Sequence, residues 1–307
     1  MKHWVTYPIA NSAANADLVS KEALTRFAQT AESAGFDGIG FTDHPAPTHK
    51  WLQSGGHDAL DPFAALAFVA AVTERLRLIP NICVLPYRNP FIVAKSVATI
   101  SALSGDRFVL AVGTGYLRGE YRALGVDPDE RNDLFDEALE VLRGVWTTDD
   151  FAYEGRRFTA AGQTANPKPG RPVPVWIGGN GDRARQRVAD VGDGWNPFAA
   201  PATLARTTRT PALETAADLA VMLEDLWRRV DAVGRDRTEL DIAFTTAAGG
   251  PPSSDSFDGD AHLAALDELA SLGVTWNGVS VAGDSLSQAL ETLERYGTVV
   301  IAADRAR

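Results

Sequence analysis

Two kinds of hydrophobic pattern alternate along the chain. Short apolar segments rich in β-branched residues predict buried strands, and longer segments with an apolar residue every three or four positions predict amphipathic helices. A helical pattern follows each predicted strand, so no two strands are consecutive. The predicted strands are residues 4–7, 38–42, 76–85, 108–112, 173–177, 194–196, 240–245 and 274–281.

The predicted helices begin and end at residues that are typical of helix termini. Ser20 is a suitable N-cap for a helix that runs to Ala34, and Gly35 follows where a left-handed C-terminal cap is expected. Asp61-Pro62 and Asn89-Pro90 each combine an N-cap with a proline in the first turn. Further helices are predicted at 134–146, 182–190, 213–233, 261–272 and 286–296.

Eight strand–helix units predict a parallel sheet of the α/β class, because parallel strands need crossover connections. About 300 residues suit a (β/α)8 TIM barrel. A doubly wound open sheet is the alternative, but no Gly-x-Gly-x-x-Gly follows the first strand. We expect a single domain over 1–307, with an inserted hairpin at about 150–172. Long loops at 198–213 and 249–260 fall on the C-terminal face, either as binding loops or as plain surface loops.

The charge of the chain limits its partners. Lys and Arg number 29 and Asp and Glu 40, so the net charge is −11. This argues against binding nucleic acid or an anionic membrane, but a local arginine cluster can still bind an anionic ligand. One cysteine, Cys83, excludes a disulfide within the chain. Residues 1–14 lack the apolar core of a signal peptide and no apolar run is long enough to span a membrane, so we expect a cytoplasmic protein.

Candidate catalytic groups are sought at the C-terminal ends of the strands, where barrel enzymes carry them. The second strand ends in Asp43-His44, and histidine is the side chain best suited to move a proton near neutral pH. Adjacent strand residues point to opposite sides, so the two side chains are not expected to pair. A pair satisfied only by backbone groups is the alternative. Asn81, between prolines in the third strand region, indicates a local irregularity.

Glycine-rich turns follow the fourth and fifth strands. Gly113-Thr114-Gly115 would allow a flat ligand to approach the backbone closely. Residues 178–181 precede a helix start, where free N–H groups bind phosphate well, and Arg183 is close by. A glycine turn without a ligand remains open. The five histidines match no zinc-binding pattern, so no metal is expected.

Several motifs in order resemble the bacterial luciferase-like flavin and deazaflavin oxidoreductases, and especially the actinobacterial branch that uses coenzyme F420. The motifs are Ala34-Gly35-Phe36-Asp37-Gly38, Thr42-Asp43-His44, Leu85-Pro86-Tyr87-Arg88-Asn89-Pro90, Leu103-Ser104-Gly105-Asp106-Arg107, Gly113-Thr114-Gly115-Tyr116, Trp176-Ile177-Gly178-Gly179-Asn180 and Gly192-Asp193-Gly194-Trp195. The resemblance is strong over about 27–197 and loose elsewhere.

The resemblance implies a barrel that holds a tricyclic cofactor at its C-terminal mouth. It implies a cis peptide bond at Asn81-Ile82 that bulges against the ring. It also implies His44 as the acid or base near the reactive carbon. The other cofactor-binding residues that it implies are Asp43, Gly113, Thr114, Gly115, Gly178, Gly179, Asn180, Gly181 and Arg183.

The substrate pocket departs from the pattern of the deazaflavin sugar dehydrogenases. Those enzymes carry a glutamate after Gly-Thr-Gly, where this chain has Tyr116, which argues against a sugar-phosphate substrate. Trp51, Tyr87 and Tyr116 are the candidate substrate contacts by position. Arg183, Arg206 and Arg209 are candidates for holding the acidic tail of F420.

The resemblance therefore leads to three functional hypotheses. The first is an F420-dependent oxidoreductase that transfers a hydride between the deazaflavin and a small organic substrate. The alternative is a luciferase-like monooxygenase that uses flavin mononucleotide (FMN), oxygen and a separate reductase. The third is a flavin-binding barrel without activity. A homodimer is common in the family and is expected here.

Overall fold

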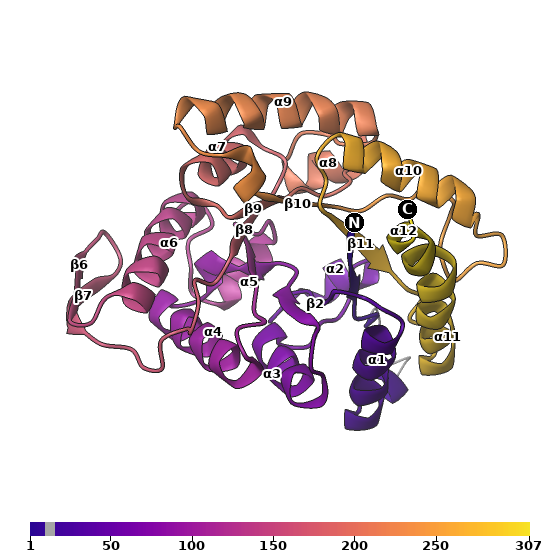
Figure 1. Ribbon diagram of the computed structural model, residues 1–307. Helices are drawn as coiled ribbons and strands as arrows, with labels where there is room; N and C mark the ends of the chain where they lie inside the picture. Colours follow the sequence, from indigo (N-terminus) through magenta and orange to yellow (C-terminus); the bar gives the residue numbers. More distant parts are fainter. Residues whose placement is uncertain (10–15) are drawn as a thin grey trace.

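A computed structural model describes residues 1–9 and 16–307 (Figure 1). In the described chain, nine parallel strands follow one another in the order β3-β2-β1-β11-β10-β9-β8-β5-β4. A parallel bridge between Leu78 of β3 and Phe108, which lies just before β5, closes the barrel. The strands are β1 (Lys2–Thr6), β2 (Gly38–Phe41), β3 (Arg77–Pro80), β4 (Cys83–Val84), β5 (Leu110–Gly113), β8 (Val175–Gly178), β9 (Gly194–Asn196), β10 (Asp241–Phe244) and β11 (Trp276–Ser280).

The predicted TIM barrel is confirmed, with one strand split in two. The segment predicted as a single strand at 76–85 forms β3 and β4, and the Asn81-Ile82 peptide between them is cis. The irregularity predicted at Asn81 is therefore a break between two separate strands. β3 pairs with β2, whereas β4 pairs with β5, so the two pieces together occupy one of eight positions around the barrel.

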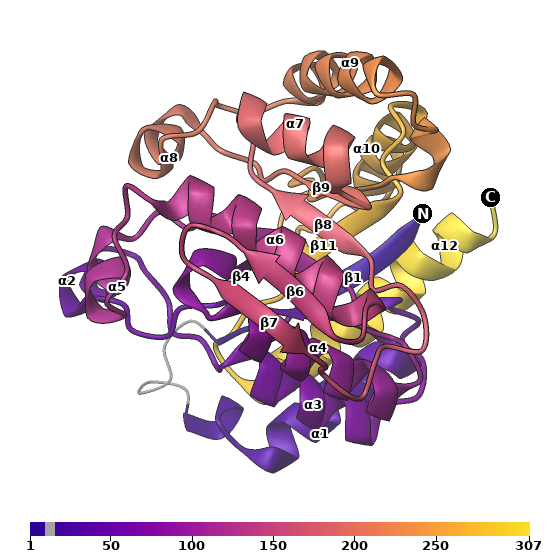
Figure 2. The same ribbon diagram turned by 90° about the vertical axis from the view of Figure 1, so that its left-hand side faces the viewer.

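Helices surround the barrel on its outside (Figures 1 and 2). None of the described helices is both long enough and apolar enough to cross a membrane. The helices are α1 (Lys21–Ser33), α2 (His49–Gln53), α3 (Pro62–Val72), α4 (Pro90–Ser104), α5 (Arg118–Ala123), α6 (Arg131–Thr147), α7 (Asp182–Val191), α8 (Ala202–Thr208), α9 (Ala216–Ala232), α10 (Gly259–Ser271), α11 (Leu286–Tyr296) and α12 (Ala302–Arg305), with a π-helical turn at Gly297–Ile301.

The predicted helix caps act as expected. The side chains of Ser20, Asp61 and Asn89 accept hydrogen bonds from backbone N–H groups in the first turns of α1, α3 and α4. Gly105 closes α4 in the left-handed conformation. The helix predicted at 213–233 begins later, at Ala216, because Leu213 pairs instead with Ala200 in an isolated bridge. The short helices α2, α5 and α8 were not predicted, since they contain too few turns for a periodic pattern.

The inserted hairpin is also present. β6 (Phe151–Glu154) and β7 (Thr159–Gln163) pair antiparallel, away from the barrel strands (Figure 1). The hydroxyl of Tyr153 donates to Glu140 of α6 at 2.9 Å, which ties the hairpin to that helix.

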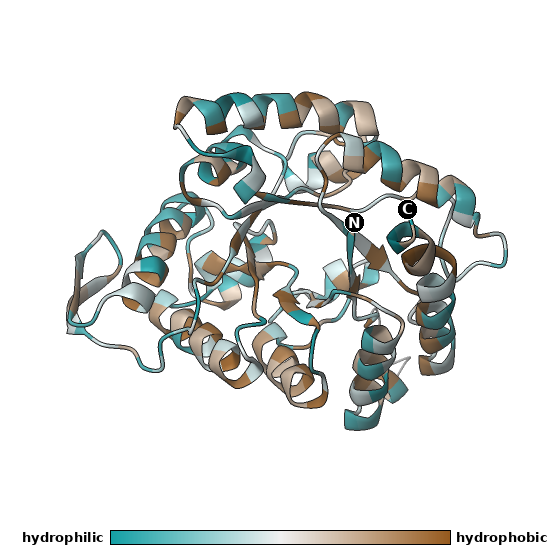
Figure 3. Ribbon diagram, in the orientation of Figure 1, coloured by the Kyte–Doolittle hydropathy of each residue, from teal (hydrophilic) through white to brown (hydrophobic). Residues whose placement is uncertain are grey.

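The helices α3 and α4 carry mostly apolar residues (Figure 3) because they pack on the barrel and on each other.

Three tryptophans fill the interior of the barrel. Trp4, Trp176 and Trp276 are at most 2% exposed, and Trp176 contacts both others edge to face, with ring centroids 6.4 and 5.2 Å apart. Glycines on neighbouring strands leave the room for these rings. A Cβ atom at Gly194 would lie 2.4 Å from the Trp176 ring, and one at Gly278 would lie 2.5 Å from the Trp4 ring.

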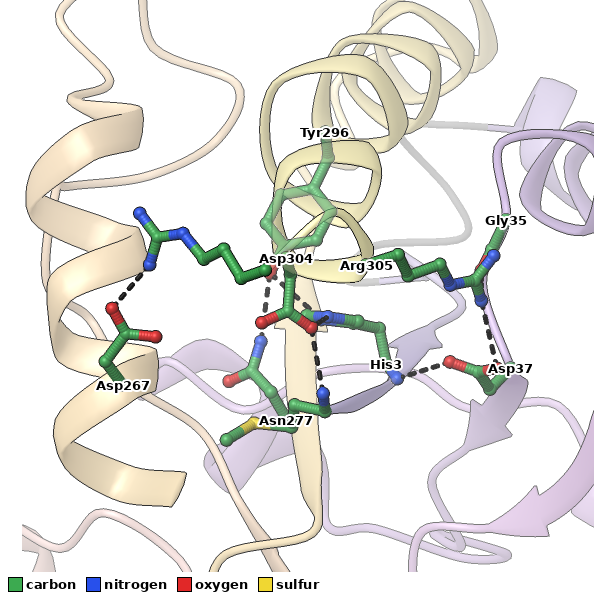
Figure 4. Close-up of polar contacts among 10 residues, drawn as sticks. His3, Gly35, Asp37, Asp267, Asn277, Tyr296, Asp304 and Arg305 are labelled. Carbon is green, nitrogen blue, oxygen red and sulfur yellow. Dashed lines mark hydrogen bonds and ion pairs between the residues drawn. The ribbon is translucent and has the colours of Figure 1, made fainter. Parts of the chain in front are cut away.

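A buried polar cluster joins the first and last elements of the barrel (Figure 4). The hydroxyl of Tyr296 lies 3.0 Å from Nδ2 of Asn277 and 3.4 Å from Nδ1 of His3. His262 of α10 lies 3.0 Å from the same hydroxyl. Asp304 contacts the other nitrogen of His3 at 3.3 Å and the terminal amine at 2.9 Å. Burial lowers the pKa of His3 and of His262, so the folded state favours the neutral form of each ring.

Gly278→Ala is expected to destabilise the barrel by about 1–3 kcal/mol, because the added methyl group overlaps the Trp4 ring and overpacks the core. Gly181→Ala is the matched control, since a Cβ there meets nothing within 4 Å and its φ of −80° suits alanine. Urea unfolding measures both. Equal stability of the two variants would contradict this account of the interior.

Stability is expected to fall as the pH drops below about 6.5, the ordinary histidine pKa. His3 and His262 have lowered pKa values in the fold, so below that pH the unfolded chain binds more protons than the native state. The melting temperature between pH 8 and pH 5 measures the effect. His262→Gln should show a shallower decrease, and an unchanged slope would rule out a contribution from this histidine.

Candidate functional site

A cavity of about 960 Å³ opens at the C-terminal ends of the barrel strands. Thr42 follows β2, Gly113 and Gly178 end β5 and β8, and Asn196 ends β9; all four line the cavity. The predicted loop at 198–213 contributes lining residues between Phe198 and Thr210. Its prediction as a possible binding loop therefore fits the geometry, whereas no described residue of the 249–260 loop reaches the lining.

The cis bulge forms part of the cavity floor. Asn81 and Ile82 both line the cavity. A Cβ at Gly113 would lie 2.0 Å from the end of the Ile82 side chain, so only glycine leaves room for the isoleucine. Asn196 donates to the side-chain oxygen of Asn81 at 2.9 Å and holds it from β9. The bulge is therefore held by contacts from β5 and β9.

His44 sits at one side of the cavity and is held by a buried carboxylate. Its Nδ1 lies 3.2 Å from Oε2 of Glu120, which is 1% exposed. Tyr87 donates to the same oxygen at 3.2 Å, and the Ala46 N–H donates to Oε1 at 3.2 Å. Burial and then Glu120 raise the pKa of Tyr87, so its hydroxyl stays a donor. An ionised Glu120 only accepts hydrogen bonds, so His44 carries a proton on Nδ1 and leaves Nε2 for chemistry.

Aromatic rings surround His44. The rings of Trp51 and His57 lie 4.7 and 4.9 Å from it, and Tyr116 lies 6.4 Å away, measured between centroids. His57 and Tyr116 line the cavity, whereas Trp51 packs on both histidines from outside the lining. Burial, followed by repulsion from His44, lowers the pKa of His57.

The glycine-rich turn after β8 leads into the start of α7 at the cavity. Gly181 is the N-cap of α7, and no side chain in the described part of the chain caps this helix start. These free N–H groups therefore suit an anion. The side chain of Asn180 is already used, because it donates to the Phe198 carbonyl at 2.9 Å and accepts from the Phe198 N–H at 3.0 Å. It fixes the loop that covers this end of the cavity.

The cavity lining is rich in positive charge. The lining formed by the described residues contains five arginines and neither aspartate nor glutamate. Some of these arginines are held from behind by carboxylates outside the lining: Arg183 pairs with Asp133 and Asp136, and Arg118 pairs with Asp129. The five are Arg118, Arg131, Arg183, Arg187 and Arg209.

The structure brings together most, but not all, of the predicted site residues. Asp43 lies outside the cavity lining. Its carboxylate binds the Arg88 guanidinium at 2.8 Å and the Val84 N–H at 3.0 Å. The lining therefore does not include the predicted cofactor-binding residue Asp43, whose carboxylate is already bound by these two partners. Tyr87 likewise lies behind Glu120, outside the lining, so it supports the site and does not form its surface.

The predicted residues that do line the cavity are His44, Asn81, Ile82, Gly113, Thr114, Gly115, Tyr116, Gly178, Gly179, Asn180, Gly181 and Arg183. Arg209 lines it as well, whereas Arg206 on α8 does not. The sequence reasoning missed Glu120, which lies 76 positions from His44. An acidic residue shortly after a Gly-Thr-Gly turn was the available signal, but its helix has only six residues and shows no periodic pattern. It also missed His57 and the arginines of α5 and α6.

These features fit a large planar cofactor with an anionic extension. Asn81, Ile82 and the glycines at 113 and 178 line the same cavity as His44, and the start of α7 and the five arginines offer sites for negative charge. FMN, with one phosphate, would use the start of α7. F420, with a phosphate and an acidic tail, would use the arginines too.

Solved structures share this fold. The monooxygenase RslO1 from Streptomyces bottropensis superposes with a TM-score of 0.81 over 99% of both chains at 19% identity. A secondary alcohol dehydrogenase described as F420-dependent superposes with a TM-score of 0.75 over 98% of both chains, also at 19% identity. At this identity the likeness concerns the fold.

Sequence comparison identifies the family. An enzyme named F420-dependent glucose-6-phosphate dehydrogenase, from Segniliparus rotundus, is 32% identical over 214 residues, or 67% of this chain and 62% of that protein. Such alignments span 55% to 66% of the length of the curated relatives. The model of the luciferase-like monooxygenase family matches residues 1–249. The chain therefore belongs to the luciferase-like monooxygenase family.

Proposed function

We propose that this chain is an F420-dependent oxidoreductase that transfers a hydride between the deazaflavin and a small organic substrate. The observation that carries the proposal is the charge of the cavity: five arginines line it without a described acidic residue, in a chain of net charge −11. Three of the five, Arg118, Arg183 and Arg187, pair with carboxylates outside the lining, whereas Arg131 and Arg209 have no carboxylate partner among the described residues. A lining of this kind suits an anionic ligand. The name of the Segniliparus relative supports the cofactor. A homodimer and a cytoplasmic location remain predictions.

Each part of the cavity has a role in this proposal. The bulge at Asn81-Ile82 and the turn at 113–115 would support the ring. The N–H groups at the start of α7 would bind the phosphate, and Arg183 and Arg209 the acidic tail. When bound, the deazaflavin supplies a carbon that gives or accepts a hydride. The protein then has to hold the substrate carbon within reach of it, since correct placement lowers the barrier.

His44 would exchange the proton that accompanies the hydride. Glu120 holds Nδ1, so Nε2 is the nitrogen free to give or take a proton at the substrate oxygen. The carboxylate also offsets the positive charge that the ring carries when protonated, as in other carboxylate–histidine pairs. Tyr87 and the Ala46 N–H keep Glu120 in place. These contacts fix the orientation of the His44 ring and keep its proton on Nδ1.

An FMN-dependent monooxygenase is the second candidate. The uncapped start of α7 can bind a single phosphate without any of the arginines. Such an enzyme would consume oxygen and would need a separate reductase. The two candidates differ in their use of the lining arginines, which only the acidic tail of F420 would contact.

Titration with F420 and with FMN, followed by quenching of the seven tryptophans, is expected to show tighter binding of F420. Arg209→Gln should weaken F420 binding by about two- to five-fold, the size of a partly exposed ion pair. It should leave FMN binding unchanged. Arg206→Gln is the matched control, because this neighbouring arginine is outside the lining. Tighter binding of FMN would instead favour the monooxygenase.

Glu120→Gln is expected to lower kcat by about 100-fold, at the low end of acid–base contributions, because a neutral amide no longer fixes the proton on His44. The substrate would be the one found in a screen for F420 oxidation or reduction. F420 affinity should be unchanged. Glu140→Gln is the control, since it removes another carboxylate that binds a tyrosine, far from the cavity. Equal activity of both variants would overturn the role of Glu120.

A further inference from the structure

The segment 82–88, which contains β4, contributes to the surface of the cavity. Ile82 lines the cavity, and its side chain lies where Gly113 has no Cβ atom. Val84 packs on Gly115 in the same way, because a Cβ atom there would lie 2.5 Å from a methyl group of the valine. Both glycines line the cavity as well. The position of this segment therefore sets the shape of the surface that a bound ring would meet.

The same segment also supports His44. Tyr87 donates to Glu120 at 3.2 Å, and the carboxylate of Glu120 lies 3.2 Å from Nδ1 of His44. A shift of the segment would move the tyrosine hydroxyl and would change how the carboxylate holds the imidazole. One short stretch of chain thus carries part of the cavity surface and part of the support of the candidate acid–base group.

Arg88 and Asp43, which lie outside the cavity lining, hold this segment. Oδ2 of Asp43 accepts from the Val84 N–H at 3.0 Å. The Arg88 side chain binds both carboxylate oxygens, with Nη2 2.8 Å from Oδ1 and Nε 3.3 Å from Oδ2. Such a fork fixes direction as well as distance. Nη2 of Arg88 also lies 2.9 Å from Asp61, the N-cap of α3, so the segment is tied to the start of that helix.

The arginine is needed because the Asp43 carboxylate is buried. The Asp43 side chain is 1% exposed, and Arg88 is the only basic side chain at ion-pair distance from it in the part of the chain that the structure describes. Removing one partner of a buried ion pair is strongly destabilising, so the backbone that the carboxylate holds would rearrange. Since neither residue lines the cavity, an effect on a ligand has to pass through the segment.

We propose that Arg88 is a positioning residue: through Asp43 and the Val84 N–H, it holds the segment 82–88 in the place that ring binding requires. This rests on the proposed function and assigns a role in it to a residue outside the cavity. Every ligand with the tricyclic ring depends on this surface, whatever anionic groups it carries. Loss of the fork is therefore expected to weaken FMN and F420 binding by the same factor, unlike Arg209→Gln, which weakens F420 binding alone.

Tryptophan quenching with FMN and with F420 compares Arg88→Lys and Arg88→Gln with the wild-type protein. The lysine variant keeps the positive charge and should fold, but an ammonium group cannot form the fork. We expect the affinity for both ligands to fall by about three-fold in Arg88→Lys and about ten-fold in Arg88→Gln, as for other residues that act without touching the ligand. Unchanged affinity in folded Arg88→Lys would overturn the proposal.

Arg143→Gln is the matched control. Arg143 binds Asp193 at 2.9 Å, and that carboxylate accepts from the Val175 N–H at 2.9 Å, so the same kind of pair holds the start of β8. These three residues lie outside the cavity lining. This variant should bind both ligands as the wild-type protein does. An equal loss in Arg143→Gln and the Arg88 variants would show a general effect of stability and would contradict the assignment.

The thiol of Cys83 gives a readout that needs no cofactor. Cys83 lies between Ile82 and Val84, is fully buried and is the only cysteine in the sequence. A thiol reagent such as 5,5′-dithiobis(2-nitrobenzoate) can therefore reach it only when the segment opens. In protein without ligand, we expect Arg88→Lys to react at least about five-fold faster than the wild type, and Arg143→Gln at the wild-type rate. Equal rates in all three proteins would overturn the positioning role.

The two measurements separate this inference from the proposed function. If neither FMN nor F420 binds the wild-type protein, the proposed function fails, and the thiol rates alone decide whether Arg88 holds the segment. If both ligands bind, and bind the Arg88 variants equally well, the positioning role is wrong and the proposed function stands. Faster thiol reaction with unchanged ligand affinity would show that the pair holds the segment without serving ring binding, and would also overturn the proposal.

Discussion

The filling of the barrel interior is the constraint on which the rest of the structure depends. Trp4, Trp176 and Trp276 occupy the space that eight strand positions enclose, and Gly194 and Gly278 give the rings their room. A close-packed interior transmits small displacements instead of absorbing them. The strand ends above these rings are therefore held in place, and Thr42, Gly113, Gly178 and Asn196 line the cavity at or next to those ends.

Above this core, the site is assembled from contacts between distant segments. Ile82 packs where Gly113 has no side chain, and Asn196 holds Asn81 from β9. Glu120, from a short helix after β5, binds His44 after β2. In both arrangements, residues that follow different strands of the barrel hold one another in place. The barrel supplies the distances, and loops alone could not hold them.

The distribution of charge explains how an acidic chain can offer a site to an anion. The carboxylates near the cavity lie behind the arginines, at Asp129, Asp133 and Asp136, and orient them from outside the lining. The negative charge of the chain thus supports a local positive surface without entering it. Glu120 is enclosed by its three donors and lies outside the lining, so its carboxylate does not form part of the cavity surface next to His44.

The sequence by itself determined the features that depend on neighbouring residues. Periodicity predicted the strand–helix alternation, and the caps at Ser20, Asp61 and Asn89 act within a single turn. The residues around Asn81 predicted only a local irregularity, and the resemblance to the luciferase-like family implied the cis peptide at Asn81-Ile82 that the structure contains. Only the tertiary structure decided that Glu120 binds His44 and which arginines reach the lining. Those contacts join residues far apart in the chain, and the closure of the barrel, which no local pattern encodes, brings them together.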